Sequence, residues 1–447
     1  MDEATDALSL LGDLVARAQR AGADAADAVL FEGMSLAHAQ RLGRIEKLER
    51  SESFDVGLRV FIGKRQATVS SNERDPARID ELVERAVAMV RAVPEDPYCG
   101  LAPAELLAKQ WPDLDLLDPI EPAPEALIAR AAAAEDAARA VPGITNSEGA
   151  EASWSRSRLA LVASNGFSGV HGGTGHSVSA AVLAGEGTQM ERDYDFTSAV
   201  HAGDLEEASL VGRRAGERAV KRLKPRKVPT AKVPILFDPR VAGSILRHLI
   251  SAITGPSVTR GTSFLKDKLG KQILPRGVSV IDDPHRRRGL RSRPFDGEGA
   301  ATRRRAIVSD GVLETWILDC ASARQLGLQS TGHASRGAGG PPGPSPSNLW
   351  LEPGTVTREA LISDIQSGFY VAELMGMGVN GVTGDYSRGA AGFWIEKGAL
   401  AYPVSEITIA GNLKDIFQNL TPAKDLKFRT GIDAPTIRID GMTVAGA

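Results

Sequence analysis

Residues 54–62 read Phe-Asp-Val-Gly-Leu-Arg-Val-Phe-Ile, and apolar side chains recur at every second position from Phe54 to Ile62. Successive side chains of a β-strand point to opposite faces of its sheet, so a period of two predicts a strand with one buried face. A half-buried strand is typical of antiparallel sheets. We therefore expect this stretch to belong to an antiparallel meander.

The flanking elements complete an N-terminal α+β domain. Apolar residues at three- to four-residue spacing predict helices over 6–20 and 76–92. An Ala-rich helix is expected over 123–141 and a charged helix over 204–223. Between these two helices, residues 148–200 alternate again and predict further strands.

Two irregular segments suggest how the chain is divided. Residues 93–122 contain six prolines without a clear period, and we expect them to run over the surface because proline disfavours helix interiors and central strands. The basic segment 221–232 is interpreted as an exposed interdomain linker whose charges are solvated. The expected domains are therefore 1–225 and 233–447.

The second half predicts a mostly β domain. A strand over 233–237 precedes a helix over 239–253, and short strands then alternate with Gly- and Pro-rich loops. The loop at 329–347 is too long for a simple connection, and such loops are usually functional or disordered. The predicted fold class is α+β, with a helix-and-antiparallel-meander N-terminal domain and a mostly β C-terminal domain.

Composition excludes several classes of function. A net charge of −3 over 447 residues gives no general attraction to nucleic acid or to an anionic membrane. Two distant cysteines, Cys99 and Cys320, suit a reducing compartment. The N-terminus is acidic, unlike a secretory signal, and no apolar run approaches the ~18–20 residues of a membrane helix. We expect a cytoplasmic protein without nucleic-acid or membrane partners.

Common catalytic motifs are absent from the sequence, including HExxH, the Walker A loop and the G-x-S-x-G elbow. Residues 376–381 fit G-x-G-x-x-G, but a glycine-punctuated, strand-like stretch follows where a dinucleotide site needs a helix. His171 and His176 flank a glycine run without further ligands, so we interpret them as loop histidines. No metal site is expected in this chain.

An arginine-rich segment at 285–305 contains eight arginines, with Asp296 and Glu298 between them. Arginines at this density could bind phosphate or a peptide carboxylate. The alternative is an internal salt-bridge network on a surface hairpin. We favour the network because acids are interspersed and aromatic residues, which stack on bases, are few.

Several blocks together resemble one family. Residues 378–396 read GVNGVTGDYSRGAAGFWIE, and three further blocks lie at 263–265, at 282–284 with 292–299, and at 406–413. In these blocks and in their order, the chain resembles the TldD/PmbA family of peptidases over nearly its whole length. Within that family the resemblance is to the PmbA/TldE type.

The resemblance implies a cytoplasmic metallopeptidase assembly for small or unfolded polypeptides and peptide maturation. Its TldD-type subunit bears zinc on an HExxxH helix with a distant cysteine, and the PmbA/TldE type is its partner in a heterodimer or related oligomer. In the matching helix, Arg247 and Ala252 stand where the zinc histidines would be, and His248 replaces the glutamate. No cysteine follows Cys320. Since guanidinium and methyl groups cannot ligate zinc, we expect the zinc in the partner and no activity of this chain alone.

The resemblance implies that this chain helps to form a peptide cleft or a subunit interface and has no catalytic residue of its own. Glycine-rich strands let another backbone approach closely, although the same glycines could simply form tight turns. The candidate residues are Gly381, Gly384, Asp385, Tyr386, Arg388, Asp296, Glu298 and His248.

Three functions remain open at this point. The first is an enzyme subunit that acts on peptides only with a TldD-type partner. The second is a non-catalytic homodimeric scaffold that binds peptides or a protein. The third is an autonomous hydrolase that uses, for example, Ser177 with His176.

Overall fold

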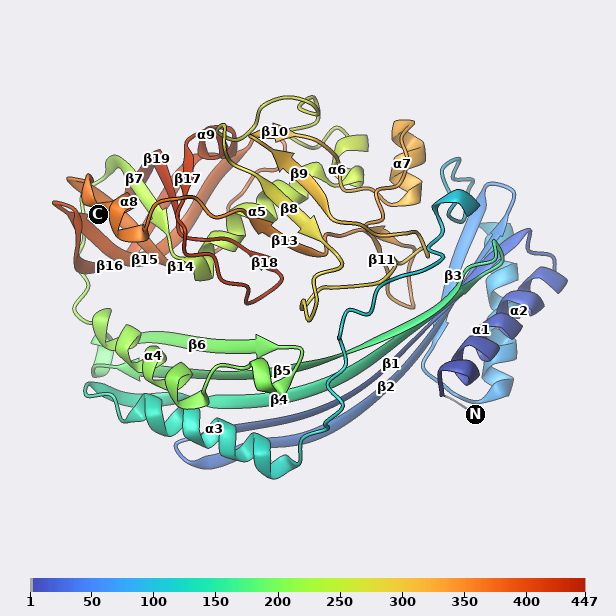
Figure 1. Cartoon of the computed structure of the whole chain (residues 1–447), viewed down its shortest axis with the longest axis horizontal. Helices are drawn as coiled ribbons and strands as arrows, with labels where there is room; N and C mark the ends of the chain where they lie inside the picture. The colour runs from blue at the N-terminus through green and yellow to red at the C-terminus, as the bar shows by residue number, and fades with distance from the viewer. Residues whose placement is uncertain (1–2, 447) are drawn as a thin grey trace.

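A computed structural model describes residues 3–446, with all their side chains except those of 3–4, 76–80 and 188. The predicted α+β class is confirmed, because two helix pairs cover a long N-terminal sheet and the C-terminal half is mainly β (Figure 1). No helix within the described range has the length and apolar character needed to cross a membrane.

The N-terminal sheet has six antiparallel strands in the order β3-β2-β1-β4-β5-β6, so the predicted meander is present as two three-stranded units. Its strands are β1 (Ala25–Arg41), β2 (Arg44–Ile62), β3 (Arg65–Ser71), β4 (Ile144–Ala163), β5 (Ser168–Ala184) and β6 (Glu191–Ala199). Its helices are α1 (Glu3–Arg20), α2 (Pro76–Ala92), α3 (Pro124–Arg139) and α4 (Ala208–Lys221). The first pair of helices covers one end of the sheet and the second pair covers the other (Figure 1).

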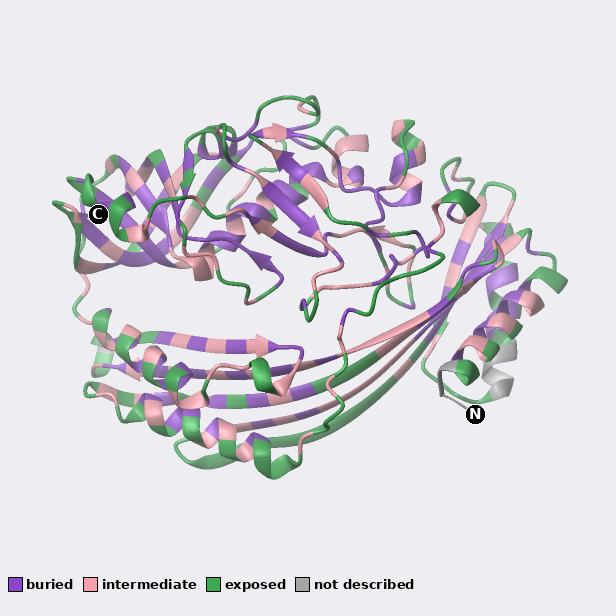
Figure 2. Cartoon of the chain, viewed as in Figure 1, coloured by how far each residue is buried: buried purple, intermediate pink, exposed green. Residues whose placement is uncertain are grey.

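Alternation along β1 assigns its two faces. Leu30 packs with α1 and α2, and Leu36 packs with α3, so the even-numbered side chains face the helices. Val29, on the opposite face, packs in a cluster with Phe295 of the C-terminal half. The sheet is therefore a central layer between its own helices and the second half of the chain (Figures 1 and 2).

Residues 54–62, the last part of β2, are more buried than their alternation predicts. Leu58 packs under the helices as expected, but Arg59 and Phe61 on the other face are buried as well. The prediction of one solvated face is wrong because the C-terminal half covers it. Gly57 permits this contact, since a Cβ there would lie 2.2 Å from the Ala338 carbonyl oxygen.

The C-terminal half contains two larger sheets, β16-β15-β14-β7-β19-β17 and β10-β9-β8-β13-β18. Because β16 also pairs with β19, the first sheet curls back on itself into a barrel-like form. The strands are β7 (Ala231–Phe237), β8 (Val280–Asp283), β9 (Arg305–Ser309), β10 (Val312–Leu313), β13 (Asn348–Leu351), β14 (Ser367–Met375), β15 (Asp385–Glu396), β16 (Ala399–Asn412), β17 (Leu420–Pro422), β18 (Ile432–Asp433) and β19 (Ile437–Ala445). The helices are α5 (Pro239–Ile253), α6 (Gly255–Thr259), α7 (Cys320–Leu326), α8 (Arg358–Ser363) and α9 (Leu413–Gln418).

The proline-rich segment 93–122 runs over the surface as expected, and its only buried residues are Cys99, Ala102, Ala108 and Leu114. It has no long helix or strand, as predicted, but its backbone bonds to both sides. Ala108 N donates to Gly299 O at 2.9 Å, and Thr174 N donates to Leu116 O at 2.8 Å. The segment therefore follows the surface across the boundary, and these backbone hydrogen bonds attach it to both halves.

The basic connector at 221–232 is only partly solvated. Arg222 is buried and pairs with Glu373 at 2.6 Å and with Asp193 at 3.5 Å. Val228 is buried in the C-terminal core. The expected exposed linker is therefore wrong for Arg222, which bridges the two halves.

The long loop at 329–347 is held in place by the N-terminal half. It contains a two-stranded hairpin, β11 (Ala334–Ser335) with β12 (Gly343–Pro344). Arg336, between these strands, reaches the N-terminal sheet and pairs with Asp27 at 2.6 Å.

Candidate functional site

Helix α5 positions the first candidate side chains. Asp238 caps it by accepting a hydrogen bond from Arg240 N at 2.9 Å, and Pro239 occupies the first turn, where no amide donor is needed. The buried stripe that includes Ile245 and Leu249 anchors the helix in the C-terminal core. Its other face presents Arg247, His248 and Ser251.

His248 opens onto a pocket of about 220 Å³. The pocket brings together three of the predicted residues, His248 from α5, Gly381 from the loop before β15, and Arg388 from β15. Tyr386, a fourth, is buried beside it, and its ring meets the His248 ring edge-on with centroids 5.7 Å apart. The remaining lining residues are Ser251, Ala252, Ser257, Thr262, Phe264, Met377, Val379 and Leu413.

Burial sets the protonation of these groups. Burial, and then the positive charge of Arg388, lower the pKa of His248 to about 4. Its imidazole is therefore neutral at pH 7. Burial raises the pKa of Tyr386, and Arg388 opposes only part of that shift, so the phenol keeps its proton.

Three buried polar atoms around this pocket have no hydrogen-bonding partner among the described residues: His248 Nε2, Tyr386 Oη and Arg388 Nε. Leaving a buried polar group unpaired costs about 1–3 kcal/mol, and most such groups in native proteins are paired. The arrangement suits a ligand with polar atoms, such as a peptide backbone, that would supply the missing partners.

Asp385 and Gly384 lie outside the pocket. Asp385 is exposed and accepts hydrogen bonds from Thr383 Oγ1 at 2.6 Å and Asn412 Nδ2 at 3.1 Å. Gly384 has φ +88°, in the left-handed region. These two residues stabilise the turn before β15, so the alternative of tight-turn glycines is correct for Gly384.

Asp296 and Glu298 lie away from His248, in the boundary between the two halves. Asp296 accepts hydrogen bonds from the backbone amides of Glu298, Ala300 and Ala334 at 2.9–3.1 Å. Glu298 accepts from Cys320 N at 2.8 Å. Neither residue lines the pocket beside His248, and their buried carboxyl groups instead accept hydrogen bonds from loop amides.

The arginine-rich segment joins β8 to β9 and bonds mainly within the protein. Arg288 Nε donates to Asp115 at 2.6 Å, and Arg293 Nη2 donates to Ser345 O at 2.7 Å. These partners agree with the favoured internal network. No helix follows Gly381, since the chain turns into β15, as expected for a fortuitous G-x-G-x-x-G match.

The proposed Ser177–His176 pair does not form. Adjacent strand residues point to opposite faces. Ser177 Oγ hydrogen-bonds Ser153 Oγ at 2.7 Å, and His176 Nε2 lies 3.2 Å from the Asp118 carboxylate. The structure therefore removes the particular nucleophile and base suggested for an autonomous hydrolase.

The residues at the pocket beside His248 do not fit a metal ion. Among the residues that the structure describes, no group of three or more His, Cys, Asp or Glu side chains is placed to hold one. His248 is the single imidazole lining the pocket, and Arg388 adds a positive charge. A second cavity, lined partly by Tyr194, Phe196 and Lys427, was missed by sequence reasoning because its elements are far apart in the chain.

Superposition on solved structures shows which proteins share this fold. A putative modulator of DNA gyrase from Bacteroides thetaiotaomicron superposes with a TM-score of 0.90 at 27% identity, covering 98% of each chain. TldE from Thermococcus kodakarensis shares the fold with a TM-score of 0.87 at 20% identity, covering 98% of this chain and 100% of that one.

Sequence comparison identifies the family. Models for PmbA/TldA metallopeptidase domain 1, central domain and C-terminal domain match residues 32–90, 117–223 and 230–446. Metalloprotease PmbA of Escherichia coli O157:H7 is 41% identical over 426 residues, covering 95% of this chain and 92% of that protein. A PmbA homolog of Haemophilus influenzae is 37% identical, covering 96% and 94%. The chain belongs to the PmbA/TldD metallopeptidase family.

Proposed function

We propose that this chain is the PmbA/TldE-type subunit of a cytoplasmic metallopeptidase, and that a TldD-type partner subunit supplies the zinc. The assembly acts on small or unfolded polypeptides, including peptides under maturation. One observation supports the assignment most: α5 and β15 place His248, Ala252 and Arg388 around one pocket, and Arg247 lines the neighbouring cavity. The resemblance matches Arg247, His248 and Ala252 to the zinc motif of a TldD-type subunit.

Zinc-dependent hydrolysis needs several ligands, an open coordination position and a base for the bound water. The neutral His248 offers one ligand atom. Arg388 repels a cation, and neither Arg247 nor Ala252 has a lone pair for a metal. The chain alone is therefore expected to lack peptidase activity.

The pocket beside His248 is suited to peptide binding. Arg388 and the protonated Tyr386 are donors that a peptide carbonyl could accept from, and the neutral His248 can donate or accept. A peptide in extended form would satisfy these buried atoms without a change in the protonation of His248, Tyr386 or Arg388. The chain thus contributes by orienting substrate and completing the oligomer.

The test is cleavage of an unstructured peptide in the presence of zinc, by this chain alone, by the TldD-type partner alone and by their mixture. We expect full activity only in the mixture, and no stoichiometric zinc on this chain after dialysis. Cleavage by the chain alone, with zinc retained, would overturn the proposal. A stable homodimer that binds peptide but never activates the partner would favour the scaffold instead.

A further inference from the structure

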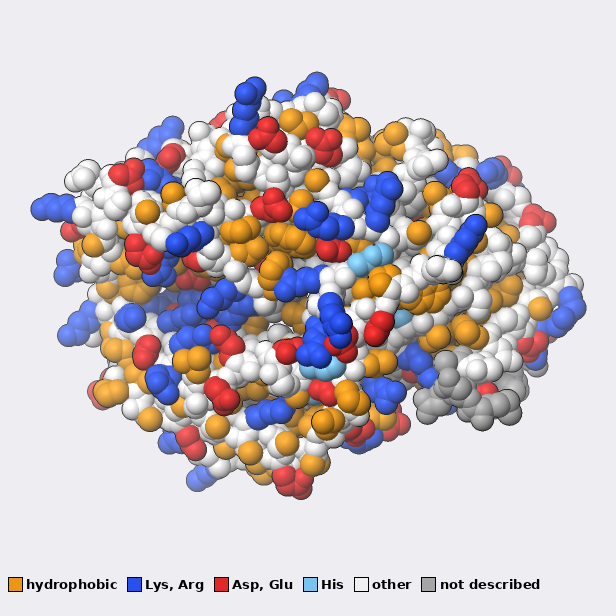
Figure 3. Space-filling model, viewed as in Figure 1, with side chains coloured by type: hydrophobic (Ala, Val, Ile, Leu, Met, Phe, Trp, Pro, Cys, Tyr) orange, Lys and Arg blue, Asp and Glu red, His pale blue; other side chains and the backbone are white. Residues whose placement is uncertain are grey.

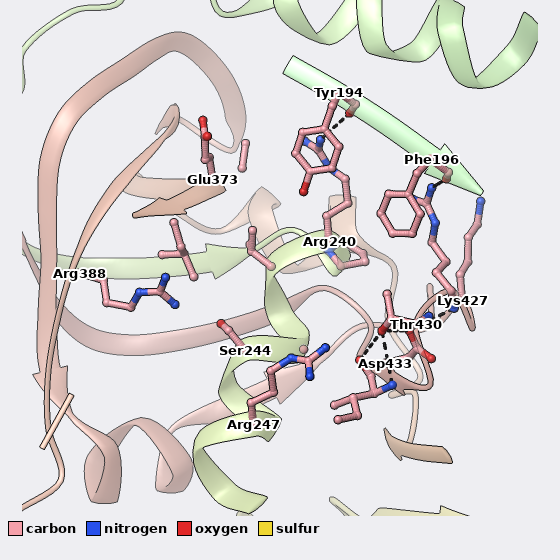
Figure 4. Close-up of a pocket in the computed structure, with 17 residues that line it drawn as sticks. Tyr194, Phe196, Arg240, Ser244, Arg247, Glu373, Arg388, Lys427, Thr430 and Asp433 are labelled. Carbon is pink, nitrogen blue, oxygen red and sulfur yellow. Dashed lines mark hydrogen bonds between the residues drawn. The ribbon is translucent and has the colours of Figure 1, made fainter. Parts of the chain in front are cut away.

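The second cavity, which Tyr194, Phe196 and Lys427 help to line, has a volume of about 300 Å³ and lies between the edge of the N-terminal sheet and the C-terminal domain (Figure 4). Strand β6 supplies the aromatic side chains of Tyr194 and Phe196. Helix α5 supplies Arg247, β15 supplies Arg388, and the loop before β18 supplies Lys427. On the face shown in Figure 3, Lys and Arg side chains gather along the boundary between the two halves.

Three cations in this cavity have no salt-bridge partner in the described part of the chain: Arg247, Arg388 and Lys427. Two other lining arginines are neutralised, since Arg240 pairs with Asp193 at 2.7 Å and Arg429 pairs with Asp195 at 2.8 Å. The unpaired charge is therefore concentrated on one part of the wall, formed by α5, β15 and the loop before β18.

Neither acid that lines the cavity forms an ion pair with these three cations among the residues that the structure describes. Glu373 is engaged by Arg222 at 2.6 Å. Asp433 accepts hydrogen bonds from the backbone amides of Thr430 and Gly431, both at 2.9 Å. Even when the negative charge of Asp433 is counted, Arg247, Arg388 and Lys427 leave the cavity with an excess of positive charge that suits an anion.

Two buried polar atoms on the wall also lack partners. Ser244 Oγ on α5 and Arg388 Nε on β15 have no hydrogen-bonding partner among the described residues. Buried polar atoms are normally paired, so these two point to a ligand with acceptor atoms. Ser244 and Arg247 lie three residues apart on α5, on neighbouring positions of one helix face.

The strand next to the cavity favours an extended peptide as the bearer of the anion. Residues 372–374 of β14 line the cavity, and residues 373–375 pair with β15 on one side. On the other side, β7 pairs only with 369–371, so the end of β14 has no strand partner there. An extended peptide can add to such an edge by backbone hydrogen bonds. The edge of β6 is different, because Arg240 Nη1 occupies Tyr194 O at 3.1 Å.

We propose that this cavity binds the carboxylate of an extended peptide, held by Arg247, Arg388 and Lys427. The carboxylate is either the C-terminal group or an Asp or Glu side chain, since the chemistry is shared. The inference rests on the proposed function in taking peptide as the substrate class. Because Arg388 lines both cavities, a carboxylate held here lies next to the pocket beside His248.

The test is binding of fluorescently labelled Gly-Ser peptides to the full chain without any partner subunit, followed by anisotropy. One peptide has a free C-terminus, one is amidated, and one is amidated but contains an internal Glu. We expect the amidated peptide without Glu to bind about tenfold more weakly than at least one of the others, as for loss of a charge-assisted hydrogen bond. The tighter peptide identifies the source of the carboxylate.

Variants at Arg247 and Lys427 should fold, because both side chains are exposed. Arg247→Gln and Lys427→Gln should each weaken binding of the carboxylate peptide about tenfold, while the amide peptide is unaffected. Arg276→Gln is the matched control, because Arg276 is exposed and lines neither cavity. Equal affinities for all three peptides, or equal losses in the control, would overturn the proposal. Displacement of peptide by inorganic phosphate far more readily than by acetate at equal ionic strength would assign a phosphate site and also overturn it.

This assay separates the inference from the proposed function. If peptide binding depends on the carboxylate but the mixture of the two subunits is inactive, the carboxylate site is supported and the proposed complex with a TldD-type partner is rejected. An active mixture with no carboxylate dependence in binding would reject the inference alone.

Discussion

Asp27 on β1 and Arg336 on the β11–β12 hairpin form a buried ion pair, with Arg336 Nη1 donating to Asp27 Oδ1 at 2.6 Å. Arg59 on β2 donates from Nε to the other carboxylate oxygen at 3.0 Å. Burial alone would raise the pKa of Asp27, but the charges of Arg336 and Arg59 outweigh it and leave the pKa lowered. One carboxylate thus holds a guanidinium from each half of the molecule.

Asp27→Asn should therefore destabilise the protein strongly. It leaves two buried guanidinium groups without their counter-charge, a change that costs about 3–5 kcal/mol in buried ion pairs. The urea midpoint measures the effect. Asp13→Asn is the control, since Asp13 pairs with Arg17 at an exposed position and such pairs contribute about 0–1 kcal/mol. Similar midpoints for both variants would contradict the prediction.

Glu298 gives stability a defined pH dependence. Burial, and then the charge of Asp296, raise its pKa from an ordinary 4.5 to about 7. The folded protein holds this proton up to about pH 7, and the unfolded chain loses it near 4.5. The stability contribution is therefore complete below pH 4.5 and lost as the pH rises through 7. Glu298→Gln should flatten the change in urea midpoint between pH 5 and 8, whereas the exposed variant Glu49→Gln should retain it.

The sequence predicted individual helices and strands better than it predicted which of their faces distant segments would bury. The alternation of residues 54–62 identifies a strand because it depends only on neighbouring positions. It does not show that the C-terminal half covers the second face, since Gly57 meets Ala338, about 280 positions away, and Arg59 shares the Asp27 carboxylate with Arg336.

The candidate site was predicted in part. Gly381, Tyr386 and Arg388 lie in one signature block, and the resemblance linked them to His248, so four residues of one region could be named. Asp296 belongs to another signature block and lies elsewhere. Tyr194 and Lys427 line the cationic cavity from opposite halves, and no sequence spacing connects residues that meet only through tertiary packing.

Gly57→Ala tests the close approach between the halves. The added Cβ would meet the backbone of Ala338 at 2.2 Å, and such overpacking typically costs about 1–3 kcal/mol. Gly12→Ala, within α1 with open space at its Cβ, should instead stabilise by roughly 0.5–1 kcal/mol. Urea midpoints that shift in opposite directions would support both assignments, and a Gly57→Ala midpoint no lower than that of the unsubstituted protein would refute the contact at Gly57.

Arg388→Ala tests the shared wall of the two cavities. Loss of its guanidinium should lower peptide cleavage by the reconstituted complex about tenfold, as for a charge-assisted hydrogen bond to substrate. The variant should still fold, because Arg388 forms no salt bridge with the carboxylates that the structure describes. Circular dichroism and the urea midpoint check folding. Unchanged turnover in a folded variant would remove Arg388 from the site.

Tyr386→Phe tests whether the unpaired hydroxyl is kept for function. The Tyr386 hydroxyl is buried without a hydrogen bond, so its removal should raise the free energy of unfolding by about 1 kcal/mol. The same change should reduce peptide cleavage by the complex, since a substrate carbonyl would lose a donor. Tyr370→Phe is the matched control, because the Tyr370 hydroxyl donates to Asp238 at 2.8 Å and its loss should destabilise by about 1–3 kcal/mol. A Tyr386 variant that is less stable and fully active would show that its hydroxyl serves the fold.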